Sequence, residues 1–285
     1  MYEVAQSGLI ATSYRDIPPF PVIAPESVDE AVAAMADAEG PVPYAGGTDL
    51  CGAVREGKPI GTLIWLKRLG ELRGVRVEGD TLSIGALTTH AEGAASDATA
   101  AIPGLAEAWS KLGKMRIRLS GTAGGNLMAR HTRYELSILL TALGGTARFV
   151  SGEGAAGLTS AEIWDRAEPP RSLLTRLSIP LATDLRLDYD RSLRPLMTQA
   201  LATWRDGAGK PCGRAVIATE YLRPVALDLD LAGTGAGTGA KAIAAAAFEA
   251  LPTDFADPAS GNAWLRRAGA AILARQLSRM EAARA

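Results

Sequence analysis

Two short stretches of the sequence decide how its fold is interpreted: VPYAGGTDL, from Val42 to Leu50, and SGTAGGNLMA, from Ser120 to Ala129. Both contain Ala-Gly-Gly, followed by a residue with a short polar side chain and then by Leu. Two consecutive glycines weaken a helix or a strand by about 1 kcal/mol each relative to alanine. A bound ligand is one feature that would offset this cost.

Each glycine pair has two interpretations. In the first, it only turns a corner after a strand. In the second, the backbone N–H groups of both turns point at one anionic group, because a turn of small residues lets several donors approach phosphate oxygens without a lysine. The hydroxyls of Thr48 and Thr122 and the amide of Asn126 would add donors. Two such turns from separate lobes would hold a diphosphate between them. The residues alone leave both interpretations of the glycine pairs open.

The composition limits the class of protein. The chain has 285 residues, of which 47% are hydrophobic, and its 30 basic and 31 acidic residues give a net charge of −1. This balance argues against a nucleic-acid-binding protein and against a polybasic membrane protein, which depend on excess Lys and Arg. No apolar run approaches the ~18 residues that span a bilayer. The N-terminal residues lack the pattern of a signal peptide, so we expect a cytoplasmic protein.

Few side chains suggest catalysis. The two cysteines and two histidines have no metal-ligand spacing, so we expect no metal site and no four-cysteine iron–sulfur cluster. A Ser/His/Asp triad remains open, although no G-x-S-x-G elbow is present. The glycine-rich stretches also fail the dinucleotide and phosphate-loop patterns. We therefore assign no catalytic residue and expect that a cofactor carries any reaction.

Strands and helices alternate along the chain, which predicts an α+β or α/β fold. Helices are expected over 24–40, with Ser27 as cap, from Thr89, over 105–115 and over 133–145; strands are expected before the first glycine turn, over 61–69, 75–78, 82–84 and 146–151. After Ile163 the pattern changes. LLTRLSIP and LRLDYDRS are interpreted as strands of a different sheet. LRPLMTQALATWRDGAGKP is interpreted as a strand that ends in the turn Gly207–Gly209, CGRAVIATEYLRPVALDLDL as a further strand, and the C-terminal residues as two helices. Pro169-Pro170 suggests a boundary near residues 170–180.

The order and spacing of several motifs resemble a known family. YAGGTDL, LRGVRVEGDTLSIGALTTHAEGAAS, IPGLAEAW, GTAGGNL and LLTALGGTARFV follow one another as in the FAD-binding medium subunit of the molybdenum hydroxylases. This group includes aerobic carbon monoxide dehydrogenase and the relatives of xanthine dehydrogenase. The resemblance covers nearly the whole chain, and the two glycine motifs are specific when they occur together at this spacing.

The resemblance implies an α+β fold of the vanillyl-alcohol-oxidase type. Two lobes, residues 1–60 and 61–178, would hold FAD between them, and a smaller α+β domain, residues 179–285, would follow. In the family the first glycine turn holds the diphosphate through backbone amides and the second meets the cofactor from the other lobe. Carried over to this chain, the cofactor-binding residues are Ala45, Gly46, Gly47, Thr48, Asp49, Leu50, Thr88, Thr89, Arg118, Gly121, Thr122, Ala123, Gly124, Gly125, Asn126 and Glu135.

The chain departs from the family pattern at three places. The family reads R-N-R-G-T before the second turn, whereas here Arg118 is followed by Leu119 and Ser120. Glu135 stands where the family has Asp before a helix, so the same hydrogen bonds would be made with altered geometry. The C-terminal domain of the family commonly has Y-x-K and then Arg near the flavin, but this chain has Tyr189 and Arg194 without the lysine.

Two histidines near these motifs have alternative interpretations. His90, at the end of GALTTH, is either a flavin neighbour or a structural residue at a helix start. His131, with Arg130 and Arg133, forms a basic cluster beside the second glycine turn. The cluster is either a solvated face or a binding surface for a partner subunit or for the anionic end of the cofactor.

The function implied by the resemblance is electron transfer. The chain would take electrons from 2Fe–2S clusters in a small partner subunit, which receives them from a molybdenum-cofactor large subunit, and pass them to an external acceptor. The family commonly forms a dimer of heterotrimers. Three alternatives stay open: a stand-alone flavin oxidoreductase, a non-catalytic flavin-binding relative, and a structural protein with two ordinary glycine turns. Neither the organic substrate nor the acceptor follows from the sequence.

Overall fold

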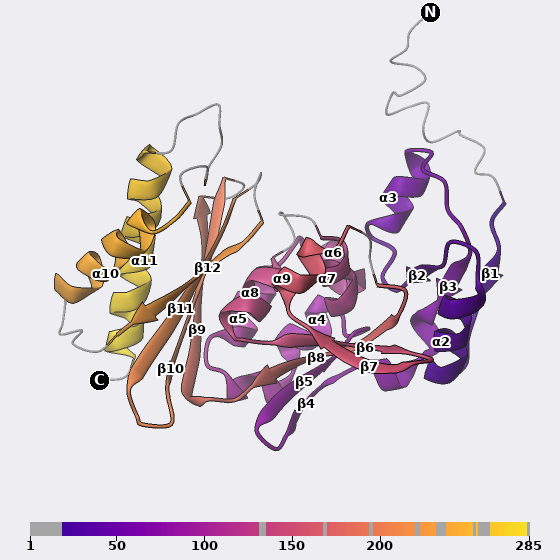
Figure 1. The fold of residues 1–285 in the computed structure, drawn as a ribbon, viewed down its shortest axis with the longest axis horizontal. Coiled ribbons are helices and arrows are strands. Elements are labelled where there is room, and N and C mark those ends of the chain that lie inside the picture. The colour runs from indigo at the N-terminus through magenta and orange to yellow at the C-terminus, as the bar shows by residue number, and fades with distance from the viewer. Residues whose placement is uncertain are drawn as a thin grey trace, which may run out of the picture.

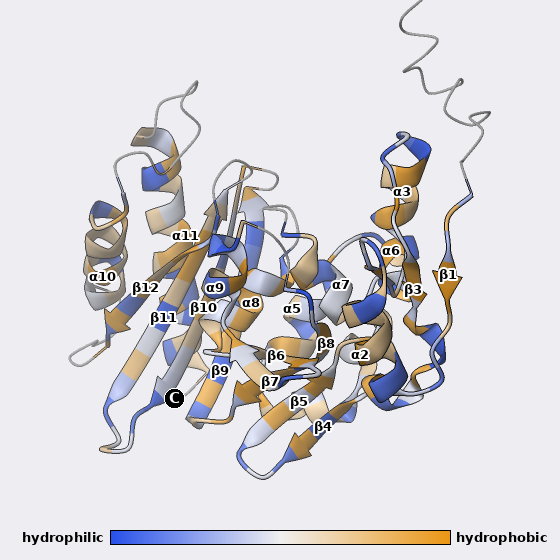
Figure 2. Ribbon diagram, turned by 45° about the vertical axis from the view of Figure 1, so that its right-hand side comes forward, coloured by the Kyte–Doolittle hydropathy of each residue, from blue (hydrophilic) through white to orange (hydrophobic). Residues whose placement is uncertain are grey.

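Three β-sheets lie in a row along the long axis of the molecule, each with its own helices (Figure 1). The computed structural model describes residues 19–130, 135–167, 170–193, 196–219, 223–231, 238–252, 255 and 263–283. Hydrophobic residues run along the strands of the sheets, and hydrophilic residues gather at the tips of the β4–β5 and β10–β11 hairpins (Figure 2). The expected mixture of helices and strands is confirmed.

The first sheet is small and parallel, with strand order β1-β3-β2. Its elements are β1 (Val22–Ile23), α2 (Val28–Asp37), β2 (Val42–Tyr44), α3 (Leu50–Arg55), β3 (Leu63–Trp65), and the short 3-10 helices η2 (Leu66–Arg68) and η3 (Gly70–Leu72). The predicted cap at Ser27 is confirmed, since its side chain accepts a hydrogen bond from the Glu30 amide at 3.2 Å. This cap satisfies an amide that α2 itself cannot pair.

The end of the first lobe was expected at residue 60, but the first sheet continues beyond it. β3, which follows residue 60, is the central strand and pairs with both β1 and β2. A strand between two others cannot be assigned to another lobe without breaking both ladders. The residues of the first sheet therefore extend to at least Trp65.

The second sheet has five antiparallel strands in the order β4-β5-β8-β6-β7. Its elements are β4 (Val75–Glu78), β5 (Thr81–Gly85), α4 (His90–Ala95), η4 (Asp97–Ala101), α5 (Leu105–Ser110), α6 (Met115–Ser120), α7 (Ala123–Met128), α8 (Leu136–Ala142), β6 (Thr146–Ser151), β7 (Gly154–Leu158), α9 (Ser160–Asp165) and β8 (Leu173–Pro180). The expected helix start at Thr89 is confirmed by a capping box with Glu92.

The assignment of LLTRLSIP to a different sheet was wrong. This stretch is β8, which lies between β5 and β6 in the second sheet. Its buried leucines and isoleucine pack with β5, β6 and α8 into one core (Leu174, Leu177, Ile179). A local apolar pattern predicts a strand but not its partners, so this placement depended on contacts distant in the sequence.

The third sheet has four antiparallel strands in the order β12-β11-β10-β9. Its elements are β9 (Thr183–Leu193), β10 (Met197–Arg205), β11 (Pro211–Thr219), β12 (Val225–Asp230), α10 (Thr238–Glu249) and α11 (Ala263–Ala282). The two C-terminal helices are confirmed, whereas the single strand expected in CGRAVIATEYLRPVALDLDL is two strands, β11 and β12.

The third sheet is buried on both faces. In β11, Ala215 and Ile217 pack toward α10 and α11, and Val216 and Ala218 pack toward the core that contains α5 and α8. Side chains alternate between the faces of a strand, so an uninterrupted apolar run such as Ala215–Ala218 predicts burial on both sides. This packing joins the third sheet to the second.

Candidate functional site

The first glycine motif forms an irregular turn between β2 and α3. Gly47 has φ +72°, a left-handed conformation that glycine adopts readily. Within the described part of the chain, the backbone amides of Gly46, Gly47 and Thr48 donate to no acceptor. Thr48 and Asp49 are exposed. A turn with adjacent free amides is a suitable anion-binding site.

The second glycine motif is not a turn, and this expectation was wrong. Thr122 is the N-cap of α7, so Gly124 and Gly125 lie in the first turn of that helix. Four amides that were expected to be free are paired inside the protein. Those of Ala123 and Gly124 donate to the carbonyls of Thr88 and Ala86 at 2.9 and 2.8 Å. Those of Gly125 and Asn126 donate to the hydroxyl and the carbonyl of Thr122 at 3.1 and 2.9 Å.

The structure nevertheless brings the two motifs together. A Cβ atom on Gly46 would lie 2.1 Å from the Ser120 carbonyl oxygen and 3.1 Å from the Gly121 Cα. Gly124 is less restricted, because a Cβ there would lie 3.0 Å from the Cβ and the carbonyl oxygen of Ala86. Gly46 permits two backbone segments to approach more closely than any side chain allows. The free amides of the first motif thus lie beside the segment that precedes α7. We call the contact of Gly46 with Ser120 and Gly121 the junction of the glycine motifs.

Thr88 and Thr89 lie beside the second glycine motif. Thr88 is fully buried, and its hydroxyl accepts from the Gly74 amide at 2.9 Å and donates to the Gly74 carbonyl at 3.1 Å. Thr89 caps α4 and forms an isolated antiparallel bridge with Thr122. Both hydroxyls therefore already have partners in the protein, and the assignment of the two residues to the cofactor stays a prediction.

The other predicted residues lie around α6 and α8. Arg118 donates to the Gly113 carbonyl at 2.8 Å. Asn126 accepts the Leu136 amide on its side-chain oxygen at 3.1 Å. Glu135 is buried at the N-terminal end of α8. Arg194, His131 and Arg133 lie outside the described residues, so the proposed basic cluster is not described; Arg130 donates to the carbonyls of Arg166 and Ala167.

His90 was not among the predicted site residues, yet it lies within the junction. Its ring is 1% exposed, and its Nδ1 accepts a hydrogen bond from the Trp109 indole at 2.9 Å. Burial, together with the nearby Arg118 charge, lowers the pKa of His90 to about 4. The ring is therefore neutral near neutral pH. The sequence signal was the position of His90 directly after the Thr89 cap, but the Trp109 partner was not visible in the sequence.

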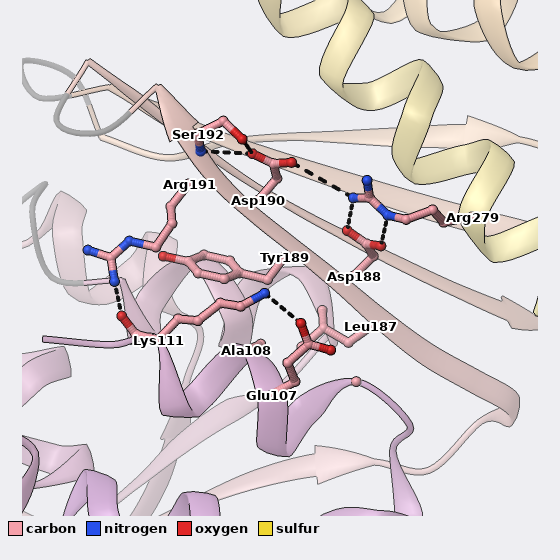
Figure 3. A pocket seen from close by; sticks show the side chains of 11 residues that line it. Glu107, Ala108, Lys111, Leu187, Asp188, Tyr189, Asp190, Arg191, Ser192 and Arg279 are labelled. Atoms are coloured by element: carbon pink, nitrogen blue, oxygen red, sulfur yellow. Dashed lines mark hydrogen bonds and ion pairs between the residues drawn. The ribbon is translucent and has the colours of Figure 1, made fainter.

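A cavity of about 490 Å³ lies between α5 and β9, with Arg279 of α11 at its edge (Figure 3). Its charged groups pair with one another: Lys111 with Glu107 at 2.7 Å, and Arg279 with Asp188 at 2.7 Å. Arg191 donates to the Lys111 carbonyl. Tyr189, which the resemblance associates with the flavin, lines this cavity. This cavity was not predicted, because it forms between elements that are distant in the chain.

Among the residues that the structure describes, no group of three or more His, Cys, Asp or Glu is arranged to hold a metal ion. No helix within those ranges is long and apolar enough to cross a membrane.

Solved structures share the whole fold. A Cu,Mo-CO dehydrogenase chain matches with a TM-score of 0.78 and 25% identity, over 94% of this chain and 99% of that chain. Quinoline 2-oxidoreductase from Pseudomonas putida 86 matches with a TM-score of 0.78 and 21% identity, over 93% of this chain and 97% of that chain. The architecture of three sheets in a row is therefore a known one.

Sequence relatives and a family model complete the comparison. Caffeine dehydrogenase subunit beta of Pseudomonas sp. (strain CBB1) is 33% identical over 44% of this chain and 43% of its own length. Carbon monoxide dehydrogenase medium chain of Afipia carboxidovorans is 30% identical over 55% of this chain and 57% of its own length. The chain thus spans about half the length of these curated relatives. The family described as FAD binding domain in molybdopterin dehydrogenase matches residues 18–182, which is more than half of the chain, and the chain belongs to this family.

Proposed function

We propose that this chain is the FAD-binding electron-transfer subunit of a heteromeric molybdenum hydroxylase. The observation that carries the proposal is the turn of free amides at Gly46, Gly47 and Thr48, packed against Ser120 and Gly121. Several adjacent N–H donors on a turn without side-chain obstruction suit a diphosphate. The relatives are named as dehydrogenase subunits or medium chains, which supports a place in a larger complex.

The first glycine motif fits FAD in the way that the resemblance implies, whereas the second does not. Ala45–Leu50 would hold the diphosphate through backbone amides. Residues 121–126 would contribute differently, because the amides from Ala123 to Asn126 are already paired. They would contribute the Thr122 hydroxyl and the Asn126 side-chain nitrogen, and Gly125, which has no side chain, would leave room for the cofactor. Thr88, Thr89, Arg118 and Glu135 complete the proposed site.

When bound, FAD would supply the capacity to accept electrons and release them to an external acceptor. The protein residues would orient the cofactor, and none is assigned as acid or base. The resemblance also associates Tyr189 with the flavin, and Tyr189 lines the cavity between α5 and β9. We extend the proposal to the vanillyl-alcohol-oxidase type of fold and to a cytoplasmic location. We also propose three domains, the first of which extends beyond the expected residue 60 to at least Trp65 and the second beyond the expected residue 178 to at least Pro180.

The proposed partners are a molybdenum-cofactor large subunit and a 2Fe–2S small subunit, in a dimer of heterotrimers. The test is purification of the native complex with flavin, iron and molybdenum analysis. We expect about one FAD per chain, because such cofactor sites are few per protein, together with two further polypeptides. A colourless chain that takes up no added FAD would contradict the proposal.

The same purification separates the alternatives. A yellow chain that purifies alone and oxidises an organic substrate would favour a stand-alone flavin oxidoreductase. A yellow chain that co-purifies with its partners but accepts no electrons from them would favour a non-catalytic relative.

A further inference from the structure

The hydrogen bonds around His90 leave one acceptor missing. Its Nδ1 accepts the Trp109 indole N–H at 2.9 Å, so this nitrogen carries a lone pair. A neutral imidazole has one N–H group, which must then be on Nε2. Because burial and the Arg118 charge lower the pKa of His90 to about 4, this neutral form dominates near neutral pH. The Nε2–H group of His90 is therefore a donor.

The group that faces this donor is also a donor. The side-chain nitrogen Nδ2 of Asn126 lies 3.4 Å from His90 Nε2. The orientation of the amide is fixed, because Asn126 Oδ1 accepts the Leu136 N–H at 3.1 Å. A flipped amide would place its NH₂ group against that N–H. An amide nitrogen cannot accept a hydrogen bond, so His90 and Asn126 each present an N–H that the other cannot bind.

The two donors lie at the junction of the glycine motifs. A Cβ atom on Gly121 would be 3.3 Å from His90 Cδ2, the ring carbon bonded to Nε2. The first glycine motif packs against the same segment, through Gly46 on Ser120 and Gly121. His90 is 1% exposed, whereas Asn126 is only partly buried. An oxygen that reaches both donors would therefore approach from the Asn126 side, beside the free amides.

We infer that His90 Nε2–H and Asn126 Nδ2–H together bind one acceptor oxygen of FAD. Trp109 acts as a positioning residue, since its indole holds the His90 proton on Nε2. This inference rests on the proposed function and adds to it a specific pair of side-chain donors. It explains how residues 121–126 serve the cofactor although their backbone amides from Ala123 onward are paired inside the protein.

The direct test is NMR of the imidazole nitrogens in the full-length chain, freed of flavin and then titrated with FAD. The chain has only two histidines, so His90→Gln assigns the signals. We expect the proton of His90 on Nε2 in both states, with the Nε2–H resonance shifted by FAD. Titration with ADP and with riboflavin, which each represent one half of FAD, identifies the half that provides the oxygen.

Two substitutions of His90 form a matched pair. In His90→Asn the side-chain oxygen replaces Nδ1 as acceptor for Trp109, but the shorter side chain has no donor at the position of Nε2, next to Asn126 Nδ2. In His90→Gln the amide nitrogen replaces the Nε2 donor. Because an unsatisfied buried polar group is costly, we expect FAD to bind about tenfold more weakly to His90→Asn, and His90→Gln to retain most of the affinity.

Asn126→Asp tests the role of Asn126 beside His90, in a variant that is expected to keep its fold. One carboxylate oxygen still accepts the Leu136 amide, and the other now accepts His90 Nε2–H. We expect the flavin-free variant to melt no lower than the parent protein and to bind FAD about tenfold more weakly, because the carboxylate takes the place of the ligand oxygen.

The outcomes distinguish the inference from the proposed function. If FAD binds but the Nε2–H resonance stays unchanged, or if the proton is on Nδ1, the inference is wrong and the proposed function stands. The same conclusion would follow if the parent, His90→Asn and Asn126→Asp proteins bound FAD with equal affinity. If the parent chain binds no FAD, both are wrong.

Discussion

Gly46 and Ser120 are in backbone contact, although the first residue follows β2 of the small parallel sheet and the second ends α6. A Cβ atom on Gly46 would lie 2.1 Å from the Ser120 carbonyl oxygen, closer than any real side chain tolerates. Two segments far apart in the sequence thus approach each other backbone to backbone. This contact makes the relative position of the two segments sensitive to a single methyl group.

Substitution of Gly46 by Ala should separate these segments. We expect a loss of stability of about 1–3 kcal/mol from overpacking, together with weaker FAD binding. Fluorescence titration of FAD and urea unfolding would measure the two effects. Gly52→Ala is the matched control, because an added Cβ there meets nothing within 4 Å and lies in α3. Equal behaviour of the two variants would contradict the role of the contact.

Gly47 and Gly79 allow the cost of a clash to be separated from the cost of backbone conformation. Both have positive φ, +72° and +58°, but an added Cβ meets the Tyr44 hydroxyl at 2.5 Å only in the first case. Alanine at either position costs about 1–2 kcal/mol for the left-handed conformation. We expect Gly47→Ala to be the more destabilising in urea unfolding. Similar losses at both positions would show that Tyr44 moves away at little cost.

The low pKa of His90 predicts a loss of stability in acid. The pKa is about 4 in the folded protein, against 6.5 for an unperturbed histidine. The unfolded chain therefore binds more protons between these values, so the free energy of unfolding falls as the pH falls from about 6.5 to about 4. The full contribution is roughly 3 kcal/mol, an order-of-magnitude value from the size of the shift. This contribution to the free energy of unfolding is fully present above the unfolded-state pKa of about 6.5.

This pH dependence is measured by urea unfolding of the flavin-free protein between pH 4 and pH 7, an interval that brackets the two pKa values. Comparison with His90→Gln removes the contribution of the carboxylates, which titrate in both proteins. The difference between the two proteins should change across this window. A constant difference would mean that the His90 ring titrates normally in the folded state.

The ion pair between α11 and β9 should stabilise the C-terminal domain. Arg279 contacts both carboxylate oxygens of Asp188 at 2.8 and 2.7 Å, and the Asp188 side chain is only 17% exposed. We expect Arg279→Met to cost about 1–2 kcal/mol in urea unfolding, because it removes the charged partner of a largely buried carboxylate. Lys58→Met is the control, since Lys58 and Glu56 are 67% and 65% exposed and such pairs contribute about 0–1 kcal/mol. A similar effect of both substitutions would contradict the expected difference.

Local signals in the sequence predicted much of the structure. Ser27 and Thr89 were identified as helix starts, and both cap a helix with a hydrogen bond from its third residue. The two glycine motifs were associated with one site, and they pack against each other. These features depend on residues close in sequence or on motifs specific to a family, which is why they could be predicted.

Other features depended on information that the local pattern does not contain. Gly124 and Gly125 suit either a corner or a first helical turn, and the deciding signal was Thr122, a cap residue three positions before Gly125. The place of β8 depended on which strands it pairs with, and the tautomer of His90 depended on Trp109. Neither partner is implied by sequence spacing.

The position of β8 also has a consequence for biosynthesis. β8 is the last strand of the five-stranded sheet to leave the ribosome, yet it lies between the hairpins β4–β5 and β6–β7. Until Leu173–Pro180 emerges, each hairpin presents an unpaired edge, a state that invites association with other nascent chains. Both glycine motifs are translated before β8, so the five-stranded sheet is completed only after they have been synthesised.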